Sequence, residues 1–471
     1  MVGSGPNGLA AAIRLAQAGR SVVVYEAAET IGGGMRSLEL IEPGTVHDVC
    51  SAIHPFGVGS PFLKTLPLAD FGLKWIEPPI LAAHPLDDAP SGLLFRDLAT
   101  TMDRLGVDGA AWDRLIGWPS GHIEDLLAEV YRPLPHLPRS PLVLARFGIA
   151  ALLPAEVAAR RFFDTPTAQA LWAGMAAHTI APLTSPLTSA AAILLTAVGH
   201  QVGWPLPEGG SQSIADAMAG YLRSLGGEIR TGVHVKDLAE ITDSGELSPG
   251  SPVLFDTSPR GLADICGDAL PVKFSDRLRA WKHGPGVFKV DFICSEAVPW
   301  SDPEVAKAGT VHVGGTLEEC AESEADAWAG RVSDRPFILT SEPTRFDPTR
   351  SSAGHTVLWA YCHAPHGSTV DMTEQIEAQI ERFAPGFRDT VVARHTMHAM
   401  DYQAHNPNLI GGDIAGGASR PLALMTRPRI AVNPYGTPND QVFLCSASTS
   451  PGAGVHGMCG YWAAEAALGK T

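Results

Sequence analysis

The chain of 471 residues has little charge, and the charge it carries is mostly acidic. Charged residues make up 18% and the formal net charge is −16, so there is no basic surplus to neutralise phosphates. This composition argues against a nucleic-acid partner. Hydrophobic residues reach 45%, which is typical of a well-packed globular enzyme, and the length predicts two closely packed domains.

Paired cysteines are also missing. The seven cysteines stand at positions 50, 266, 294, 320, 362, 445 and 459, with no C-x-x-C spacing, which predicts neither a zinc knuckle nor a redox dithiol. Reduced thiols and the lack of a signal peptide indicate a cytoplasmic protein. No uninterrupted apolar run reaches the roughly 18 residues that a membrane span needs. The apolar stretch 142–147, continued at 160–163, leaves a peripheral membrane contact open, with an inward-packing cap helix as the alternative.

Glycines open the chain in a G-x-G-x-x-G pattern over residues 3–8. Gly3 permits a tight turn, Gly5 lets the backbone approach a pyrophosphate, and Gly8 lets a helix pack closely against a strand. Only Met1 and Val2 precede this loop, although such loops follow a strand. We therefore expect the numbering to begin inside the first strand, the alternative being a truncated strand.

An Ala-rich helix is predicted over 9–18 and a buried parallel strand over 21–26. The helix N-terminus offers free N–H groups and a positive dipole end to phosphates. Glu26 ends the strand 18 residues beyond Gly8, close to the spacing expected for a carboxylate that accepts the ribose hydroxyls of a dinucleotide. An acid at this position disfavours a 2′-phosphate.

A second glycine-rich segment, Gly32-Gly33-Gly34-Met35-Arg36, follows Glu26. With this segment the sequence resembles the flavoprotein superfamily that contains phytoene desaturases and flavin amine oxidases. The resemblance implies that the glycine pair passes the pyrophosphate and ribityl chain of FAD. In the family an Arg often follows the pair directly, whereas here Gly34 stands there and Arg36 comes two residues later. Arg36 is therefore either a phosphate partner or a loop charge.

The resemblance also extends into the middle of the chain. In similar proteins the segment that corresponds to residues 47–55 lies beside the flavin ring. His47, Cys50 and His54 are therefore either catalytic or part of a packed polar loop. The G-G-S sequence at 209–211 precedes a helix and a strand, after which the backbone of Val233 or Val235 meets the adenine in similar proteins.

Glycines return at the C-terminal end, where a strand over 441–445, a glycine-rich turn over 452–460 and a helix over 461–468 are predicted. The resemblance implies that amides at the start of this helix meet the ribityl chain and the N1/C2 edge of the flavin. A helix N-terminus there stabilises the negative charge of reduced flavin. We expect Gly457 to be required for this approach of the backbone, and His456 either donates to the flavin or is a packed histidine.

The predicted fold class is α/β, with a Rossmann-type FAD-binding domain built on a parallel sheet and an interleaved α+β substrate domain that carries a helical cap. The FAD-binding domain takes 1–75, 200–270 and 421–471, and the substrate domain takes 76–199 and 271–420. The predicted cofactor-binding residues are Gly3, Gly5, Pro6, Asn7, Gly8, Glu26, Ala27, Gly32, Gly33, Gly34, Arg36, Val233, Val235, Gly454, His456, Gly457 and Met458, with His54 and His456 as the candidates for catalysis.

The resemblance and the apolar cap together predict an FAD-dependent, desaturase-like oxidoreductase that removes hydride from, or isomerises, a C–C bond of a hydrophobic substrate, with an isoprenoid as the candidate class. The alternatives are a flavin amine oxidase, for which no aromatic cage can be assembled from the sequence, and an FAD-binding interaction protein with little turnover. No second G-x-G-x-x-G with a strand and acid follows, which argues against a disulfide reductase. The pairs His363/His366 and His395/His398 lack further ligands at metal-site spacing, so no metal is predicted.

Overall fold

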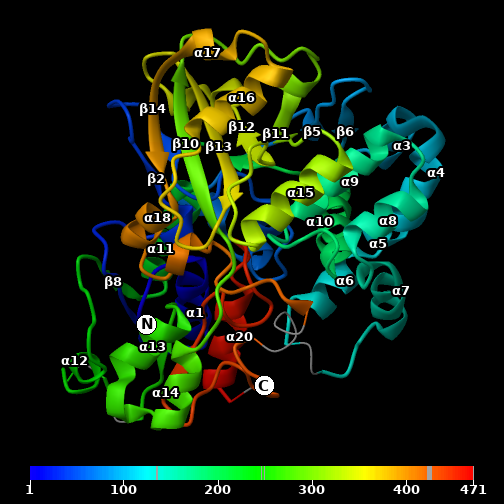
Figure 1. Ribbon diagram of the computed structural model, residues 1–471. Coiled ribbons are helices and arrows are strands. Elements are labelled where there is room, and N and C mark those ends of the chain that lie inside the picture. The colour runs from blue at the N-terminus through cyan, green and yellow to red at the C-terminus, as the bar shows by residue number, and fades with distance from the viewer. Residues whose placement is uncertain (134–135, 246, 249, 422–426, 470–471) are drawn as a thin grey trace.

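A computed structural model describes residues 1–133, 136–245, 247–248, 250–421 and 427–469. Figure 1 shows three regions: a part with α1, α13, α14 and α20 near the two ends of the chain, a sheet with β10, β13 and β14, and a group of helices from α3 to α10 beside that sheet. The α/β class with a Rossmann-type unit and a separate large sheet is the architecture predicted from the sequence.

The Rossmann-type unit is a small parallel sheet made from distant parts of the chain. β1 pairs with β8 and β9 pairs with β15, each in parallel register. Val2 joins the two pairs, because it forms parallel bridges to both Tyr25 and Phe255. Val2 thus occupies the central strand position, and the turn at Gly3 lies at the carboxyl edge of this sheet. The strands are β1 (Val23–Tyr25), β8 (Glu228–Arg230), β9 (Val253–Phe255) and β15 (Val442–Leu444).

Helices cover this sheet, and α1 packs against both α11 and α20. The apolar face of α1, including Leu9 and Ile13, is fully buried. Its contact with α20 is close: a Cβ atom on Gly460 would lie 1.8 Å from the carbonyl oxygen of Asn7. The bounds are α1 (Pro6–Gln17), α11 (Gln212–Ser224), α12 (Ala239–Thr242), α13 (Pro259–Cys266), α14 (Val272–Arg279) and α20 (Met458–Ala467).

The second sheet has seven strands in the order β14-β10-β13-β12-β11-β5-β6. It is mixed: all its pairs are antiparallel except β11 with β5. Its strands are β5 (Ile80–His84), β6 (Gly92–Leu94), β10 (Gly286–Cys294), β11 (Ala308–Val313), β12 (Ile338–Ser341), β13 (Thr356–Ala364) and β14 (Val391–Met397). Three helices after β11 lie between its strands along the chain: α15 (Leu317–Trp328), α16 (Thr373–Phe383) and α17 (Phe387–Thr390). α18 (Ala399–His405) follows β14.

The helical cap follows β6. Its long Ala/Leu/Thr-rich segment over 168–200 is broken between α9 and α10. Within the break, Ile180 (φ 52°) and Leu187 (φ 70°) adopt left-handed backbone, which β-branched and bulky residues rarely do. The cap helices are α3 (Leu98–Leu105), α4 (Gly109–Trp112), α5 (Trp118–Gly121), α6 (Ile123–Val130), α7 (Pro141–Ala151), α8 (Ala155–Phe162), α9 (Pro166–Ala177) and α10 (Thr188–Val202), with a π-helical turn at Asp113–Gly117.

α7 carries the apolar stretch that was considered for membrane contact. Val143 and Phe147 pack inward, whereas Leu142 is 81% and Ile149 76% exposed. Within the described ranges no helix alone combines the length and apolar character of a membrane span; α7 and α8, bent by 89°, meet those criteria only as a pair. Short elements complete the fold: β2 (Ser37–Leu38) with β3 (His47–Asp48), β4 (Trp75–Ile76) with β7 (Leu206–Pro207), and α2 (Pro55–Val58).

Candidate functional site

One cavity of about 940 Å³ links the Rossmann-type unit to the large sheet and the cap. Its wall includes the loop at 3–7, the pair Gly33 and Gly34, the segment 50–57 and the C-terminal turn at 451–455. The break at 178–188 supplies part of the opposite wall. A cavity of this size is in the range of binding sites for ligands and cofactors. Segments from both ends of the chain therefore meet at one binding space, as the glycine patterns predicted.

An aspartate that was not among the residues predicted from the sequence, Asp256, contacts the first glycine loop. Asp256 follows β9, and its Oδ2 accepts a hydrogen bond from the Gly8 amide at 2.7 Å. A Cβ atom on Gly5 would lie 2.6 Å from the same oxygen, and one on Gly8 would lie 2.3 Å from the carbonyl oxygen of Gly3. Glycine is thus required at these positions by the close approach of loop, helix and Asp256.

Asp256 lies on the cavity wall at the N-terminus of α1, where a phosphate group would bind. Burial raises the pKa of its carboxyl to about 7; the Gly8 amide opposes this shift, and the negative charge of Glu26 adds to it. This carboxyl therefore titrates near neutral pH, beside the predicted phosphate position.

Glu26 is buried, with four hydrogen bonds to its carboxylate. Oε2 accepts from the Ser4 amide at 2.9 Å and the Ser4 hydroxyl at 2.6 Å. Oε1 accepts from the Ala28 amide at 2.9 Å and from Nη2 of Arg36 at 3.1 Å. Arg36 also donates from Nε to the carbonyl oxygen of Thr30. Its guanidinium therefore neutralises Glu26 in this structure, and its contact with a phosphate remains a prediction.

The remaining residues predicted to contact the adenosine half lie around the same end of the cavity. Ala27, Val233 and Val235 are on its wall. Gly32 does not line the cavity. Its backbone (φ 113°) sets the turn before Gly33, and a Cβ atom on Gly33 would lie 3.0 Å from the Cα of Gly5. The two N-terminal glycine segments therefore pack directly on one another.

The C-terminal turn reaches the cavity through Gly454 and Val455, but His456, Gly457 and Met458 do not line it. A Cβ atom on Gly457 would lie 2.8 Å from the Cβ of Ala10 on α1. Glycine at this position therefore lets α20 approach α1, and the contact of its backbone with the flavin stays a prediction.

His456 is held inside the turn. Its Nδ1 accepts from the Met458 amide at 3.0 Å, and its ring packs 4.8 Å from that of Tyr131, measured between centroids. Burial lowers the pKa of His456 to about 4, so the ring is neutral at neutral pH. These contacts favour the packed-histidine interpretation over a donor to the flavin.

His54, in contrast, lies on the cavity wall. Its Nε2 is 2.7 Å from the hydroxyl oxygen of Ser211, and that hydroxyl donates to the carbonyl oxygen of Ser51. His54 therefore donates from Nε2 and keeps a lone pair on Nδ1. Burial lowers its pKa to about 4; the charge of Asp48 opposes this shift and that of Arg350 adds to it.

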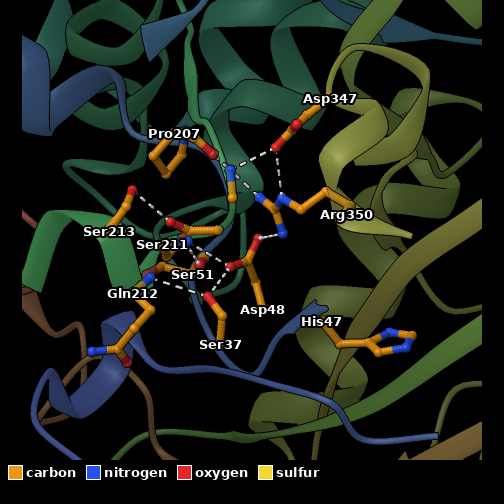
Figure 2. Close-up of polar contacts among 12 residues, drawn as sticks. Ser37, His47, Asp48, Ser51, Pro207, Ser211, Gln212, Ser213, Asp347 and Arg350 are labelled. Atoms are coloured by element: carbon orange, nitrogen blue, oxygen red, sulfur yellow. Dashed lines mark hydrogen bonds and ion pairs between the residues drawn. The ribbon is translucent and has the colours of Figure 1, made fainter. Parts of the chain in front are cut away.

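Figure 2 shows the buried network that fixes Ser211. Oδ1 of Asp48 accepts from the Ser211 amide at 2.7 Å and the Ser37 hydroxyl at 2.6 Å. Arg350 donates to Asp48 at 2.9 Å and to Asp347 at 3.1 Å. Burial opposes ionisation of Asp48, but Arg350 and these donors outweigh it and lower the pKa of the carboxyl. The network joins segments about 140 to 300 residues apart, which is why no local sequence signal reveals it.

The other two candidates in the 47–55 segment are not placed for proton transfer to a ligand. His47 is absent from the cavity wall, and its Nδ1 lies 3.5 Å from Oδ1 of Asp291. Cys50 lines the cavity, but burial raises the pKa of its thiol to about 11 against the opposing charge of Lys289. The thiol is therefore protonated at neutral pH and a weak nucleophile.

The cap and the large sheet make the other end of the cavity apolar and aromatic. Trp204, Trp359 and Tyr361 line it, the last two packing 5.0 Å apart between ring centroids. Nε1 of Trp204 donates to the Thr310 hydroxyl at 3.0 Å. Trp359 and Tyr361 both come from β13, whereas Trp204 follows α10, so no local sequence signal brings the three residues to one cavity. Aliphatic side chains complete this wall: Ile180, Leu187, Leu195 and Leu339.

The first histidine pair considered for metal binding, His363 and His366, has other partners. Nδ1 of His363 lies 2.6 Å from Oε1 of Glu324, and Nδ1 of His366 lies 2.9 Å from the carbonyl oxygen of Gly284. In the part of the chain that the structure describes, no group of three or more histidine, cysteine or acidic side chains is arranged to hold a metal ion.

Comparison with known proteins agrees with this architecture. Residues 1–66 match the family model described as NAD(P)-binding Rossmann-like domain. The mouse protein named pyridine nucleotide-disulfide oxidoreductase domain-containing protein 2 is 25% identical over an alignment that covers 99% of this chain and 92% of that protein. An uncharacterized protein of Mycobacterium tuberculosis is 26% identical, with 99% and 96% coverage.

Solved structures share the fold over the full chain. An oxidoreductase from Methanosarcina mazei has a TM-score of 0.62 at 15% identity, covering 100% of this chain and 99% of that one. A putrescine oxidase variant has a TM-score of 0.61 at 17% identity, with 100% and 98% coverage. Cyclohexylamine oxidase from Brevibacterium oxydans has a TM-score of 0.56 at 14% identity, with 100% and 98% coverage. The predicted α/β fold class with a Rossmann-type unit is thus confirmed.

Proposed function

We propose that the protein is an FAD-dependent oxidoreductase that removes hydride from a hydrophobic small molecule. The observation that carries this proposal is the single cavity that runs from the two N-terminal glycine segments and the C-terminal turn to the apolar wall of the cap. One end offers backbone and an acid to a dinucleotide, and the other offers a dry surface to a substrate. When bound, FAD supplies the hydride acceptor, and the protein supplies orientation and exclusion of water.

The residues present fit FAD. The N-terminus of α1 faces the cavity with Gly5, Pro6 and Asn7 on its wall, suited to a pyrophosphate. Glu26 marks the ribose position, and its carboxylate disfavours the 2′-phosphate of NADP. Gly454 and Val455 bring a second backbone segment to the same cavity, which a nicotinamide dinucleotide site of the ordinary Rossmann type does not need.

For the substrate, the resemblance to phytoene desaturases favours a C–C bond of an apolar, isoprenoid-like compound, with desaturation or isomerisation as the reaction. The aliphatic wall formed by Ile180, Leu195 and Leu339 supports a substrate of low polarity. His54 presents a neutral ring to the cavity, which supports a role in contacting the ligand. Its low pKa gives it little capacity as a base at neutral pH.

Amine oxidation is the second candidate, and one observation favours it. Trp204, Trp359 and Tyr361 all line the cavity, and aromatic faces attract a cationic or amine group. Proteins of the same fold include the putrescine and cyclohexylamine oxidases named above. An interaction protein that binds FAD without turnover is the third interpretation.

Anaerobic reduction of the flavin separates these functions. The full-length protein, saturated with FAD, is mixed with phytoene in detergent micelles, with cyclohexylamine, or with dithionite as a chemical control. Bleaching by phytoene alone supports the desaturase-like function, and bleaching by cyclohexylamine alone supports amine oxidation. If dithionite bleaches the flavin but neither phytoene, cyclohexylamine nor any member of a wider panel of apolar compounds does, an enzymatic role would be contradicted.

A further inference from the structure

One face of α7 is apolar and exposed. Leu142, Ile149 and the residue after the helix, Leu152, are 81%, 76% and 61% exposed. Their spacing of seven and three residues places them on one side of the helix. The opposite side, with Val143 and Phe147, packs into the cap. Figure 1 shows α7 at the outer edge of the cap, away from both sheets, and an apolar stripe in such a place marks an interaction surface.

The start of α7 is held in place by the buried carboxylate of Glu129. Its Oε1 accepts from the backbone amides of Arg139 and Ser140 at 2.6 and 2.7 Å. Its Oε2 lies 2.6 Å from Nε2 of His136. Leu137, which is 90% exposed, lies between these contacts along the chain. The exposed side chains at this end are therefore presented by a fixed backbone.

The other end of α7 is bonded to a segment that walls the cavity. The carbonyl oxygen of Leu152 accepts from the Leu187 amide, and that of Leu153 accepts from the Ser189 amide, both at 3.3 Å. Leu187 is part of the apolar wall of the cavity. The exposed stripe is thus linked by backbone hydrogen bonds to the break between α9 and α10.

The charge around this stripe is opposite in sign to that of the chain as a whole. Residues 137–163 contain four arginines and one glutamate, which is a formal charge of +3, whereas the full chain carries −16. Arg160 forms ion pairs with two glutamates. Arg139, Arg146 and Arg161 are exposed, and no carboxylate of the described residues lies at ion-pair distance from them. Their charges are therefore available to an anionic partner.

We propose that this face of α7 docks the protein on an anionic lipid bilayer. The apolar side chains enter the boundary between head groups and acyl chains, and the arginines contact the lipid phosphates. A second copy of the chain would be the other occupant, but in a symmetric dimer the face meets itself and brings the arginines of both copies together. The charge thus favours the lipid. The docking face consists of Leu137, Arg139, Leu142, Arg146, Ile149 and Leu152.

Vesicle flotation tests the docking and requires no turnover of the protein. The purified full-length protein is mixed with vesicles of phosphatidylcholine alone, or of an equal mixture of phosphatidylcholine and phosphatidylglycerol, and the bound fraction gives a partition coefficient. Each arginine near an anionic surface strengthens binding about fivefold. With Arg139 and Arg146 on the docking face, we expect the mixed vesicles to bind the protein about five- to twentyfold more tightly. High salt should reduce this preference.

Two double variants separate the apolar contact from the charged one. Leu142→Ser with Ile149→Ser removes two exposed apolar side chains, so partition into both kinds of vesicle should fall at least about tenfold. Arg139→Gln with Arg146→Gln should abolish the preference for phosphatidylglycerol and leave binding to phosphatidylcholine nearly unchanged. These side chains are exposed, so circular dichroism and thermal unfolding should match those of the unmodified protein.

The matched control is Val272→Ser with Val392→Ser, which changes two exposed apolar residues on α14 and β14, away from α7 (Figure 1). Its partition should equal that of the unmodified protein. Absence of binding to the mixed vesicles, or an equal loss in the control and in the Leu142/Ile149 variant, would overturn the proposal. So would a dimer in sedimentation velocity that dissociates in the Leu142/Ile149 variant while neither protein floats, because the face would then belong to a second copy.

Discussion

The titration of Asp256 leads to a quantitative prediction about cofactor binding. Its carboxylate accepts from the Gly8 amide at the start of α1, next to the position proposed for the pyrophosphate. An ionised carboxylate there repels phosphate, so a bound dinucleotide requires the protonated form. Asp256→Asn keeps an oxygen acceptor for the Gly8 amide and removes the charge.

The sign and size of the pH effect on FAD affinity follow from the pKa of Asp256. Burial raises the pKa of Asp256 from 3.8 to about 7, so its favourable contribution to folding is complete below the unfolded value and is lost as the pH rises through 7. At about pH 8, one unit above that pKa, protonating the group costs about 1.4 kcal/mol, a factor of ten in affinity. The affinity for FAD should therefore fall about tenfold between about pH 6 and pH 8 in the unmodified protein. In Asp256→Asn the affinity should be nearly independent of pH.

The assay is a titration of flavin-free protein with FAD, followed by fluorescence quenching at both pH values. Asp268→Asn is the control, because Asp268 is exposed and lies outside the cavity wall. A dissociation constant that is constant across this pH range in the unmodified protein, or a slope that persists in Asp256→Asn, would refute the reasoning.

Three further substitutions test other contacts. Glu26→Ala removes the four hydrogen bonds of the carboxylate and the predicted acceptor for the ribose, so the affinity for FAD should fall about ten- to a hundredfold. An unchanged dissociation constant in a folded variant would mean that the ribose binds elsewhere. In Gly457→Val the new side chain meets Ala10, so the free energy of unfolding should fall by about 1–3 kcal/mol more than in Gly72→Val. Gly72 shares the positive φ but has open space around it. Equal losses of unfolding free energy in urea titrations of the two variants would show that the contact with α1 does not require glycine at 457. Arg350→Met leaves Asp48 buried and unpaired and should cost about 3–5 kcal/mol, whereas a loss below about 1 kcal/mol would show that the pair is not needed.

The parts of this fold that depend on local backbone demands were predictable from the sequence. Gly3, Gly5 and Gly8 adopt the expected loop because a tight turn and a close helix approach leave room for no side chain. The position of Glu26 follows from the fixed length of one helix and one strand.

Interactions between distant segments were not predictable. Asp256 meets Gly8 across 248 residues, and Arg350 meets Asp48 across 302. The break after α9 is only weakly marked in the sequence, because Ala, Leu and Thr suit a helix throughout and only Pro182 and Pro186 indicate an interruption. The helix contact of Gly457 was not predicted, because a glycine that packs helices and one that approaches a ligand have the same sequence signal.

The central claim is that the two ends of the chain build one FAD site, and the most direct test is the cofactor content of the protein. The full-length protein, reconstituted with an equimolar mixture of FAD, FMN and NADP and then desalted, is denatured and the released nucleotides are separated by chromatography. The account predicts FAD at about one molecule per chain and neither of the others. Release of FMN or NADP in place of FAD, or of no nucleotide from correctly folded protein, would contradict it.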